Sequence, residues 1–478
     1  MRARRIHPAL AIVAVTALAA GLRLWHLGTP AERIFDEKYY SKAGCIFVGY
    51  SQDECGIDES DERYWIEKYG DVGSWVHPPL GKWAIGLGER AFGPDAFGWR
   101  IAGVVAGSLT VAVVALTAQL LFGSVLWTLA AGLLLAVESL SFVQSRTSML
   151  DVFLALWVAL GFLFLVLDRR WIERRTPEPV EEEPPRILSP LVRPWRLAAG
   201  VALGAACATK WSGFFALGAA GLLALGWELS RRRRAGVGHP VLRTIARESV
   251  GIVIALLVVP ALVYVASYTG WFLDFGFSLK KWWALQREIA DQHLGGFRPL
   301  DAETGKATHP YQSEAWTWFL LLRPVLYHVQ DVAGGLRETI LAVGNPAVFW
   351  ASIPAIVYLP TAWGWKRDWR AGALLLPIVL QYVPWFFVGR VQFLFYMTPV
   401  VPFIVLAVVY TLRDLSSLRV SGIGSETEER GVRPFLPLAF GVVAAAVVLF
   451  AFFWPVLTGG PITTEAWQHR MWLGDRWV

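Results

Sequence analysis

Eleven long apolar stretches constrain this chain more than any other feature of its sequence. A helix that crosses a bilayer needs about 20 apolar residues, and the stretches approach or exceed that length. They are 8–27, 98–121, 125–143, 148–167, 195–209, 212–229, 248–269, 346–364, 371–388, 391–412 and 434–457. They predict an all-α integral membrane protein with about eleven transmembrane helices, forming one polytopic domain over residues 1–478. The composition agrees, because 17% of the residues are charged, against about 25% in soluble domains.

The region 195–229 allows two interpretations. A single helix of that length would measure about 52 Å at 1.5 Å per residue, which exceeds a hydrocarbon core of about 30 Å. We therefore predict two spans that are separated by a turn near Lys210.

Arginine clusters predict the orientation of the chain. Short loops that are rich in Lys and Arg stay in the cytoplasm, and clusters occur at 2–5, 169–175 and 231–234. They fall on one side if the N-terminus is cytoplasmic, so we expect a multi-pass plasma-membrane protein. Two large outer loops, 28–97 and 270–345, are then left outside. The cluster at 231–234 is interpreted as a topological anchor, and no nucleic-acid partner is expected.

Several shorter segments have their own interpretation. The run 8–27 is read as an uncleaved signal-anchor rather than a cleaved signal peptide, because no small-residue cleavage site follows it. Residues 176–185 and 421–431 are typical of flexible linkers. Residues 278–294 alternate cationic and aromatic side chains, which predicts an amphipathic helix on the outer membrane surface.

The three cysteines indicate no metal site. Cys207 lies in an apolar segment, where it is expected to pack as a small apolar residue. Cys45 and Cys55 share the first outer loop, and an oxidising compartment would allow them to form a short disulfide. The sequence leaves that pairing open.

The first outer loop carries the strongest candidates for chemistry. Asp36 and Glu37 follow the first span directly, and carboxylates so close to lipid are costly unless they are used. The alternative is that they only pair with Lys38 or Lys42. The segment His77-Pro-Pro-Leu-Gly-Lys82 is rigid and polar and leads the chain back to the membrane. His77 and Lys82 are therefore candidate supporting residues.

Charged residues within or beside apolar spans form a second group. Glu138, Arg146 and Asp151 flank the predicted turn between the third and fourth spans, and their charge should turn them towards the bundle interior. They are interpreted either as a buried structural ion pair or as a functional set in which Arg146 receives an anionic group. Lys210 and Arg390 are isolated cations at outward turns. Each would either bind a lipid phosphate or extend its side chain to the surface.

These features favour an enzyme whose donor is a lipid phosphate and whose acceptor arrives from outside. No nucleotide-binding loop is found. The sequence also lacks two matching halves with paired Gly or Pro interruptions, the pattern of many transporters. Two alternatives stay open. One is a transferase that moves another sugar, such as arabinose or aminoarabinose, from the same carrier to a glycolipid or polysaccharide. The other is a transporter or flippase.

The order of the motifs resembles the protein O-mannosyltransferases. The resemblance covers nearly the whole chain and rests on six motifs in order. They are Phe35-Asp36-Glu37, His77 to Lys82, Ser145-Arg146 to Leu150-Asp151, Thr209-Lys210-Trp211-Ser212-Gly213, His309-Pro310-Tyr311 with Trp316 to Pro324, and Gly389-Arg390 to Phe395-Tyr396.

The resemblance implies a glycosyltransferase of the GT-C class. Its donor would be a polyprenyl-phosphate mannose and its acceptor a Ser or Thr hydroxyl of an unfolded or translocating protein, with inversion and without metal or cofactor. A Sec translocon is a candidate partner. Asp36 would be the base and Glu37 would position the acceptor or the base. Arg146 would lie near the donor phosphate. To this we add Lys210 and Arg390 as phosphate ligands, on the basis of their charge and position and not of the resemblance.

One departure from the eukaryotic pattern points to the bacterial form. Eukaryotic members carry a β-trefoil domain in the second large outer loop. Residues 270–345 are too few to hold one beside the predicted helix, so no soluble β-trefoil domain is expected.

Overall fold

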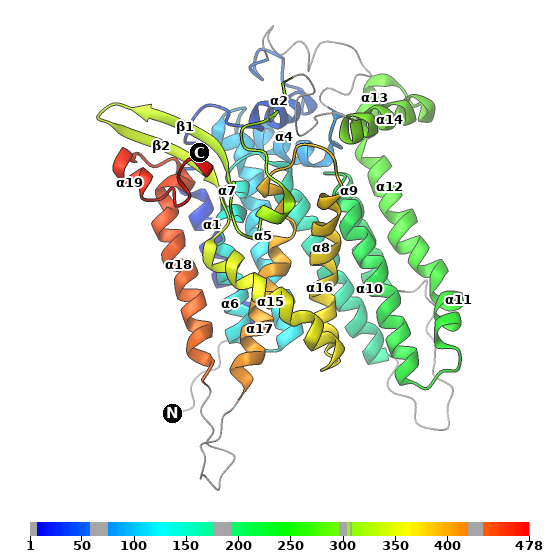
Figure 1. Ribbon diagram of the computed structural model, residues 1–478. Helices are drawn as coiled ribbons and strands as arrows, with labels where there is room; N and C mark the ends of the chain where they lie inside the picture. Colours follow the sequence, from blue (N-terminus) through cyan, green and yellow to red (C-terminus); the bar gives the residue numbers. More distant parts are fainter. Residues whose placement is uncertain are drawn as a thin grey trace.

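The chain folds into a bundle of long helices with a layer of short helices and strands at one end (Figure 1). The computed structural model describes residues 7–57, 75–175, 193–295, 304–305, 308–418 and 434–477. The predicted linkers 176–185 and 421–431 lie outside these residues. We refer to the short elements at the upper end of Figure 1 as the end layer.

Thirteen named helices build the bundle within the described residues. They are α1 (Pro8–Leu24), α5 (Ala96–Phe122), α6 (Val125–Ala136), α7 (Ser139–Ser145), α8 (Leu150–Arg175), α9 (Pro194–Cys207), α10 (Gly213–Arg234), α11 (Pro240–Val253), α12 (Val259–Ser267), α15 (Pro346–Gly364), α16 (Trp369–Tyr382), α17 (Val401–Ser417) and α18 (Leu436–Thr458). A short π-helix, Ile254–Val258, joins α11 to α12. Every predicted apolar stretch overlaps one of these helices.

The number of spans is smaller by the criteria of length and hydropathy. Among the described residues, six helices are long and apolar enough to cross a membrane, or seven if the α6–α7 pair is one span. Helices α1, α9, α16 and α17 have 17, 14, 14 and 17 residues. The count of about eleven therefore stays a prediction.

Three predicted boundaries can be compared with the helices. The turn near Lys210 is confirmed, because α9 ends at Cys207 and α10 begins at Gly213. The predicted span 125–143 is not one straight helix, since the chain bends by 61° between α6 and α7, where the Glu138 carboxylate caps a new helix. The span 391–412 is wrong at its start, because α17 begins only at Val401. Pro399 and Pro402 oppose an earlier helix.

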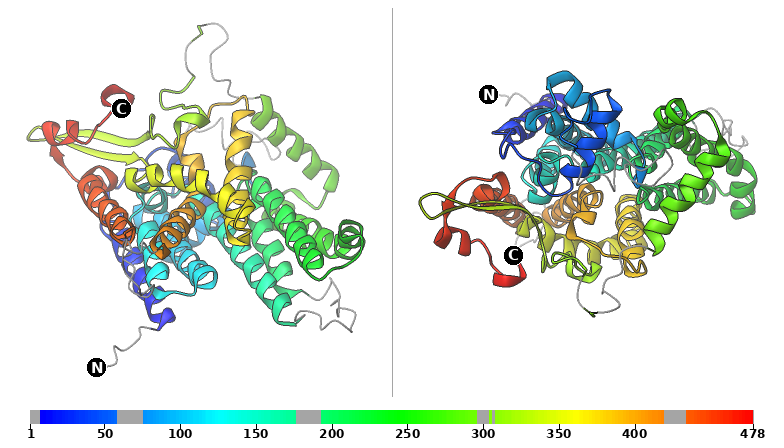
Figure 2. Two further views of the ribbon diagram at one scale, coloured as in Figure 1. Left: turned by 60° about the horizontal axis from the view of Figure 1, so that its bottom comes forward. Right: turned by 90° about the horizontal axis from the view of Figure 1, so that it is seen from above.

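The end layer contains four helices, a small sheet and a terminal turn of helix. Its elements are α2 (Glu37–Phe47), α4 (Leu80–Phe92), α13 (Thr269–Phe275), α14 (Leu279–Gly295), β1 (Val325–Val332), β2 (Leu336–Ala342), β3 (Ile462–Thr463) and α19 (Thr464–Gln468). Helix α14 confirms the helix predicted over 278–294. Seen from above, the β1–β2 hairpin and α13–α14 lie on opposite sides of the bundle (Figure 2).

The sheet corrects the expectation of an all-α fold. Strands β1, β2 and β3 pair antiparallel in that order. A three-residue connection closes the hairpin, and Gly334 and Gly335 in it adopt φ of 86° and 73°, which other residues rarely tolerate. The strands contain the β-branched residues Val325, Val329 and Val332 in β1 and Thr339 and Ile340 in β2, which favour extended structure.

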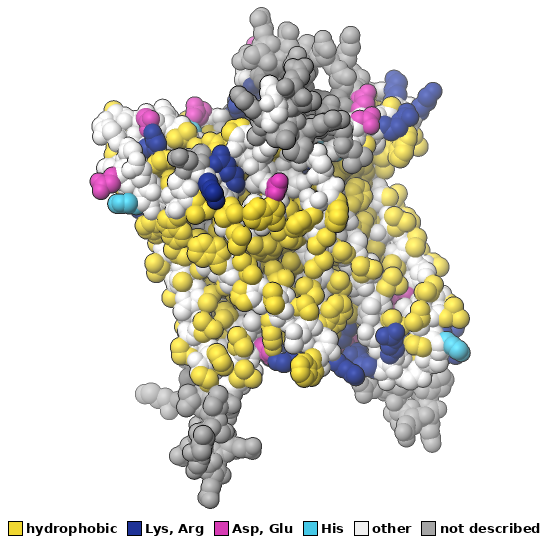
Figure 3. Space-filling model, viewed as in Figure 1, with side chains coloured by type: hydrophobic (Ala, Val, Ile, Leu, Met, Phe, Trp, Pro, Cys, Tyr) yellow, Lys and Arg dark blue, Asp and Glu magenta, His cyan; other side chains and the backbone are white. Residues whose placement is uncertain are grey.

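The surface supports a membrane-embedded, multi-pass protein. Hydrophobic side chains cover the middle of the bundle, while charged side chains gather towards its two ends (Figure 3). Large apolar residues such as Leu262 and Val357 are 64% and 72% exposed. Such exposure is stable when lipid, rather than water, surrounds the bundle.

Candidate active site

Asp36 lies at the start of α2, where the chain enters the end layer. Phe35, with φ of 47°, packs its ring on Tyr327 with centroids 4.4 Å apart and so fixes the turn. The half-buried Asp36 carboxylate accepts one long hydrogen bond, of 3.4 Å, from the Tyr40 hydroxyl. Tyr40 is one helical turn further on and therefore shares the face of Asp36. Within the part of the chain that the structure describes, the Asp36 carboxylate thus keeps most of its acceptor capacity for another group.

The surroundings of Asp36 suit a general base. Removal of the carboxylate from water raises the pKa of Asp36 to about 6, although the positive charge of Lys210 acts in the opposite direction. The negative charge of Asp151 adds to the increase. A carboxylate with a pKa just below neutral pH is largely ionised and still holds a proton well once it takes one.

Glu37 occupies a different environment from its neighbour. Its buried carboxylate pairs with Arg100 through two contacts of 2.8 Å. It also accepts hydrogen bonds from the backbone nitrogens of Ile34 and Ser148, at 3.0 and 3.1 Å. These four contacts hold α2 against α5 and the segment before α8. The structure therefore gives Glu37 an anchoring place, in which these contacts occupy both carboxylate oxygens.

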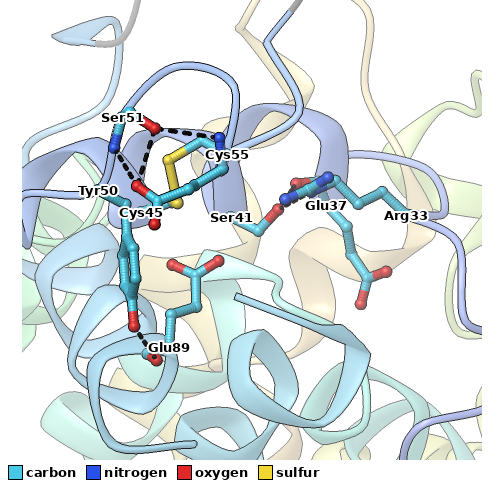
Figure 4. Close-up of a disulfide and its surroundings, with 9 residues drawn as sticks. Arg33, Glu37, Ser41, Cys45, Tyr50, Ser51, Cys55 and Glu89 are labelled. Atoms are coloured by element: carbon cyan, nitrogen blue, oxygen red, sulfur yellow. Dashed lines mark hydrogen bonds between the residues drawn. A yellow bond between two sulfur atoms is a disulfide. The ribbon is translucent and has the colours of Figure 1, made fainter. Parts of the chain in front are cut away.

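A disulfide holds the other end of α2. Cys45 and Cys55 are joined, so the pairing that the sequence left open is formed. Figure 4 shows the disulfide and Glu37 towards opposite ends of α2, with Glu89 of α4 beneath the disulfide. The Tyr50 hydroxyl donates to the Glu89 carbonyl at 3.3 Å and ties the same loop to α4.

Lys210 and Asp151 form a buried pair opposite Asp36. The Lys210 ammonium lies 2.9 Å from both oxygens of Asp151, and 4.6 Å from the centre of the Tyr396 ring. Lys210 comes from the break between α9 and α10, while Asp151 belongs to the first turn of α8. The break thus brings a cation to this group of residues, although a carboxylate already pairs with it. A phosphate-binding role for Lys210 stays a prediction.

Arg390 lies in the connection between α16 and α17. One of its terminal nitrogens lies 2.6 Å from Nδ1 of His293, and the other donates to the Tyr396 hydroxyl at 3.3 Å. Its Nε is buried and has no partner among the described residues. Arg390 therefore reaches the same site as Lys210 with donor capacity in reserve.

His77 and Lys82 border the site from the first outer loop. The His77 ring lies between Tyr40 and His293, with centroid distances of 6.0 and 5.1 Å. Burial holds the pKa of His77 well below its usual range, so the ring is neutral. Lys82 donates to the His77 carbonyl at 2.6 Å and so fixes the proline-containing segment between these two residues.

Two predicted residues lie outside this group. Arg146 donates to the carbonyls of Arg23, Trp25 and His26, at 2.7, 2.5 and 3.4 Å. Glu138 accepts from the backbone nitrogens of Leu140, Ser141 and Asn345, at 3.1, 2.7 and 2.9 Å. Both side chains are buried, as expected, but backbone groups rather than a substrate site satisfy them. Arg146 thereby fixes the end of α1, from which the chain leads to Asp36.

Three residues of the site received no role from the sequence: Tyr40, His293 and Tyr396. The spacing of Tyr40 from Asp36 is a usable signal, because side chains four residues apart on a helix are neighbours. Tyr396 ends the motif Gly389-Arg390 to Phe395-Tyr396, one of the six on which the family resemblance rests. His293 is a single histidine on an amphipathic helix, and no local pattern distinguishes it.

An apolar groove adjoins the polar site. It has a volume of about 410 Å³ and lies between α10, α12 and α14. Its lining residues include Trp211, Phe214, Leu257, Pro260, Tyr264 and Trp283. Trp211 connects the two regions, because its ring lies 5.4 Å from that of His293. A long apolar chain in the groove would bring its polar end to Arg390 and Lys210.

Comparisons with known proteins agree with this arrangement. A family model described as "Dolichyl-phosphate-mannose-protein mannosyltransferase" matches residues 13–275. A second, described as "C-terminal four TMM region of protein-O-mannosyltransferase", matches residues 278–477. Together the two models span most of the chain.

Two curated relatives and one solved structure are similar over nearly their full length. The polyprenol-phosphate-mannose–protein mannosyltransferase of Mycobacterium tuberculosis is 34% identical, covering 96% of this chain and 90% of the relative. That of Mycolicibacterium smegmatis is 32% identical, with coverage of 96% and 91%. The S. cerevisiae protein O-mannosyltransferase Pmt1-Pmt2 complex bound to the sugar donor matches with a TM-score of 0.74 at 14% identity, covering 100% and 93%. The structural match shows a common GT-C fold.

Proposed function

The chain belongs to the protein O-mannosyltransferase family and is a membrane-embedded glycosyltransferase, and from this premise we propose its reaction. It transfers mannose from a polyprenyl-phosphate mannose to a Ser or Thr hydroxyl of a protein, with inversion, at the outer face of the membrane. The observation that carries the proposal is the Asp36 carboxylate, which has little hydrogen bonding of its own and faces the charges of Lys210 and Asp151.

Asp36 is the base in this reaction. As the acceptor oxygen bonds to the anomeric carbon, its proton passes to the Asp36 carboxylate, and the bond from that carbon to the phosphate oxygen breaks. The electron pair leaves with the phosphate, which stays on the lipid. A single displacement of this kind inverts the sugar configuration. It requires one base and no covalent enzyme intermediate.

Arg390 and Lys210 receive the phosphate. Fixed cations beside a leaving phosphate stabilise the charge that develops on it in the transition state. Arg390 has a buried Nε without a partner among the described residues, so it can add hydrogen bonds to an incoming oxygen. Asp151 already offsets part of the Lys210 charge, and Arg390 is therefore the stronger phosphate ligand. The reaction as proposed uses no metal or nucleotide.

The groove accommodates the polyprenyl chain of the donor. Its walls are almost wholly apolar, and Trp211 places its inner end beside the ring of His293. The groove accounts for a lipid-linked donor, since a soluble sugar nucleotide would gain nothing from it.

The arginine-rich ends of the helices support an outer location for the site. Arg231–Arg234 end α10, at the end of the bundle opposite the end layer (Figure 1). The positive-inside rule then assigns the N-terminus to the cytoplasm and Asp36 to the outside. A protein emerging unfolded from translocation meets the site there, which makes the Sec translocon a candidate partner.

A purified assay tests the proposal. The protein in detergent is given polyprenyl-phosphate mannose with radiolabelled mannose and a peptide rich in Ser and Thr. We expect peptide labelling by the wild type and by Asp53→Asn, an exposed matched control in the same loop, but none by Asp36→Asn. Full activity of Asp36→Asn would refute the base assignment. Labelling of a glycolipid or polysaccharide instead of the peptide would refute the acceptor assignment.

A further inference from the structure

His293 connects the end layer to the polar site. It lies near the end of α14, and its ring contacts those of His77 and Trp211 at centroid distances of 5.1 and 5.4 Å. Its two nitrogens meet Arg390 on one side and the carbonyl of Val76 on the other. Two aromatic neighbours and two polar contacts therefore fix the orientation of the ring.

The partners of His293 determine its tautomer. A carbonyl can only accept, so the nitrogen 2.9 Å from the Val76 oxygen, Nε2, carries the hydrogen. A guanidinium can only donate, so Nδ1, 2.6 Å from Arg390, must offer its lone pair. Burial, together with the charge of Arg390, lowers the pKa of His293 to about 4. The ring is therefore neutral at physiological pH.

Arg390 differs from the neighbouring cations Arg100 and Lys210 in the kind of side chain that pairs with it. Carboxylates hold both Arg100 and Lys210, through Glu37 and Asp151 respectively. Among the described residues, Arg390 has no carboxylate partner, and its side chain contacts the neutral His293 and Tyr396. A carboxylate would hold a guanidinium more strongly, but it would also cancel much of its attraction for an anion. A neutral acceptor orients the group and leaves its charge available.

We propose that His293 is a positioning residue, which holds Arg390 through a neutral ring nitrogen so that the guanidinium keeps its charge for the donor phosphate. This inference rests on the proposed function, and it concerns one side chain outside the proposed reacting groups. It also explains why an imidazole, rather than an acid, faces the guanidinium. Because α14 also lines the groove through Trp283, one helix contacts both the lipid chain and the phosphate ligand.

Four variants test the proposal: His293→Gln, His293→Glu, His293→Leu and Arg390→Gln. Gln supplies an acceptor for Arg390 and a donor for Val76, and Glu has nearly the same shape with a negative charge. Leu removes both hydrogen bonds. Each variant is first compared with the wild type by size-exclusion profile and melting temperature, so that misfolded proteins are set aside.

Donor titrations at fixed peptide provide the first measurement. We expect His293→Gln to stay within about threefold of the wild type. Glu and Leu should raise the donor KM roughly tenfold or more, the size of effect expected when a hydrogen bond to a charged group is lost, while the peptide KM stays unchanged. If His293 had only a structural role, His293→Gln and His293→Glu would have similar donor KM values, because the two side chains have nearly the same shape. Equal donor KM values for these two variants would therefore overturn the proposal.

A double-variant comparison tests the route through Arg390. In an Arg390→Gln background, the difference between His293→Gln and His293→Glu should disappear. A difference that persists at full size would show that His293 acts elsewhere and would overturn the proposal.

Binding of polyprenyl phosphate, followed by thermal shift, separates failure of this inference from failure of the proposed function. This probe carries no mannose, so it reports on Arg390 even if the wild type transfers no mannose to the peptide. Weaker binding by Glu than by Gln would support the inference on its own. Equal binding by wild type, Gln and Glu would overturn it, whatever the mannose assay gives.

Discussion

The substitution Glu37→Gln distinguishes an anchoring carboxylate from a catalytic one. Glu37 is fully buried, and its partner Arg100 is 1% exposed. The carboxylate accepts two hydrogen bonds from Arg100 and two from backbone nitrogens. Each carboxylate oxygen accepts from two of these four donors, so an amide nitrogen in place of one oxygen would face two donors with its own hydrogens. It also leaves the Arg100 charge without its counter-ion.

We expect this change to lower the free energy of unfolding by about 3–5 kcal/mol, the usual cost of removing one member of a buried ion pair. Asp36→Asn is the matched control, since it makes the same chemical change one residue earlier. The pKa of Asp36 is raised in the fold, so the ionised carboxylate weakens folding as the pH rises through about 6. Removal of this charge at pH 7.5 should therefore leave the free energy of unfolding unchanged or slightly increased.

The assay is unfolding by sodium dodecyl sulfate in detergent micelles, followed by tryptophan fluorescence, alongside mannose transfer. We expect Glu37→Gln to lose both stability and activity, whereas Asp36→Asn loses activity alone. A double variant, Glu37→Leu with Arg100→Met, should recover part of the stability, because well-packed apolar residues replace a buried pair at little cost. Normal unfolding of Glu37→Gln, combined with lost activity, would refute the anchoring role.

Three further predictions concern the base, the groove and the disulfide. Mannose transfer at saturating substrates should fall as the pH drops through about 6, since protonated Asp36 cannot act as a base. A rate that stays constant from about pH 5 to about pH 8 would count against this assignment. Ala261→Trp fills the groove and should raise the donor KM without changing the peptide KM; an unchanged donor KM would place the lipid chain elsewhere. Reduction of the Cys45–Cys55 disulfide releases one end of α2 and should lower the free energy of unfolding by about 2–4 kcal/mol. The free energy is measured with and without dithiothreitol. The double variant Cys45→Ser with Cys55→Ser is the control, and its stability should not respond to the reductant.

The positions of most bundle helices could be predicted from the sequence, and so could the place of the proposed base after the first span. Hydrophobic length located the helices because lipid requires continuous helical hydrogen bonding. The break at Lys210 followed from length alone. The three-stranded sheet was missed, since neither β1 nor β2 alternates regularly between buried and exposed residues, and such alternation is the main sequence signal of a strand.

The site was harder to predict than the fold, because charge alone does not reveal a partner. Arg146 and Glu138 were expected to be buried, and they are, but their partners are backbone groups that any sequence offers. Glu37 differs from Asp36 through tertiary contacts with Arg100 and the backbone nitrogen of Ser148. His293 reaches Arg390 across a separation of 97 residues, and no local pattern encodes such a contact. The roles proposed for these residues remain predictions.

The groove has a further consequence for how this enzyme meets its donor. Phe214, Leu257 and Trp283 line it and are 49%, 59% and 59% exposed, so it opens sideways between helices. With the donor lipid in this groove, as proposed, we expect substrate and product to exchange with the surrounding two-dimensional lipid phase. The relevant concentration is a mole fraction in the membrane, and added detergent should slow turnover by surface dilution even when the bulk amount of donor is constant.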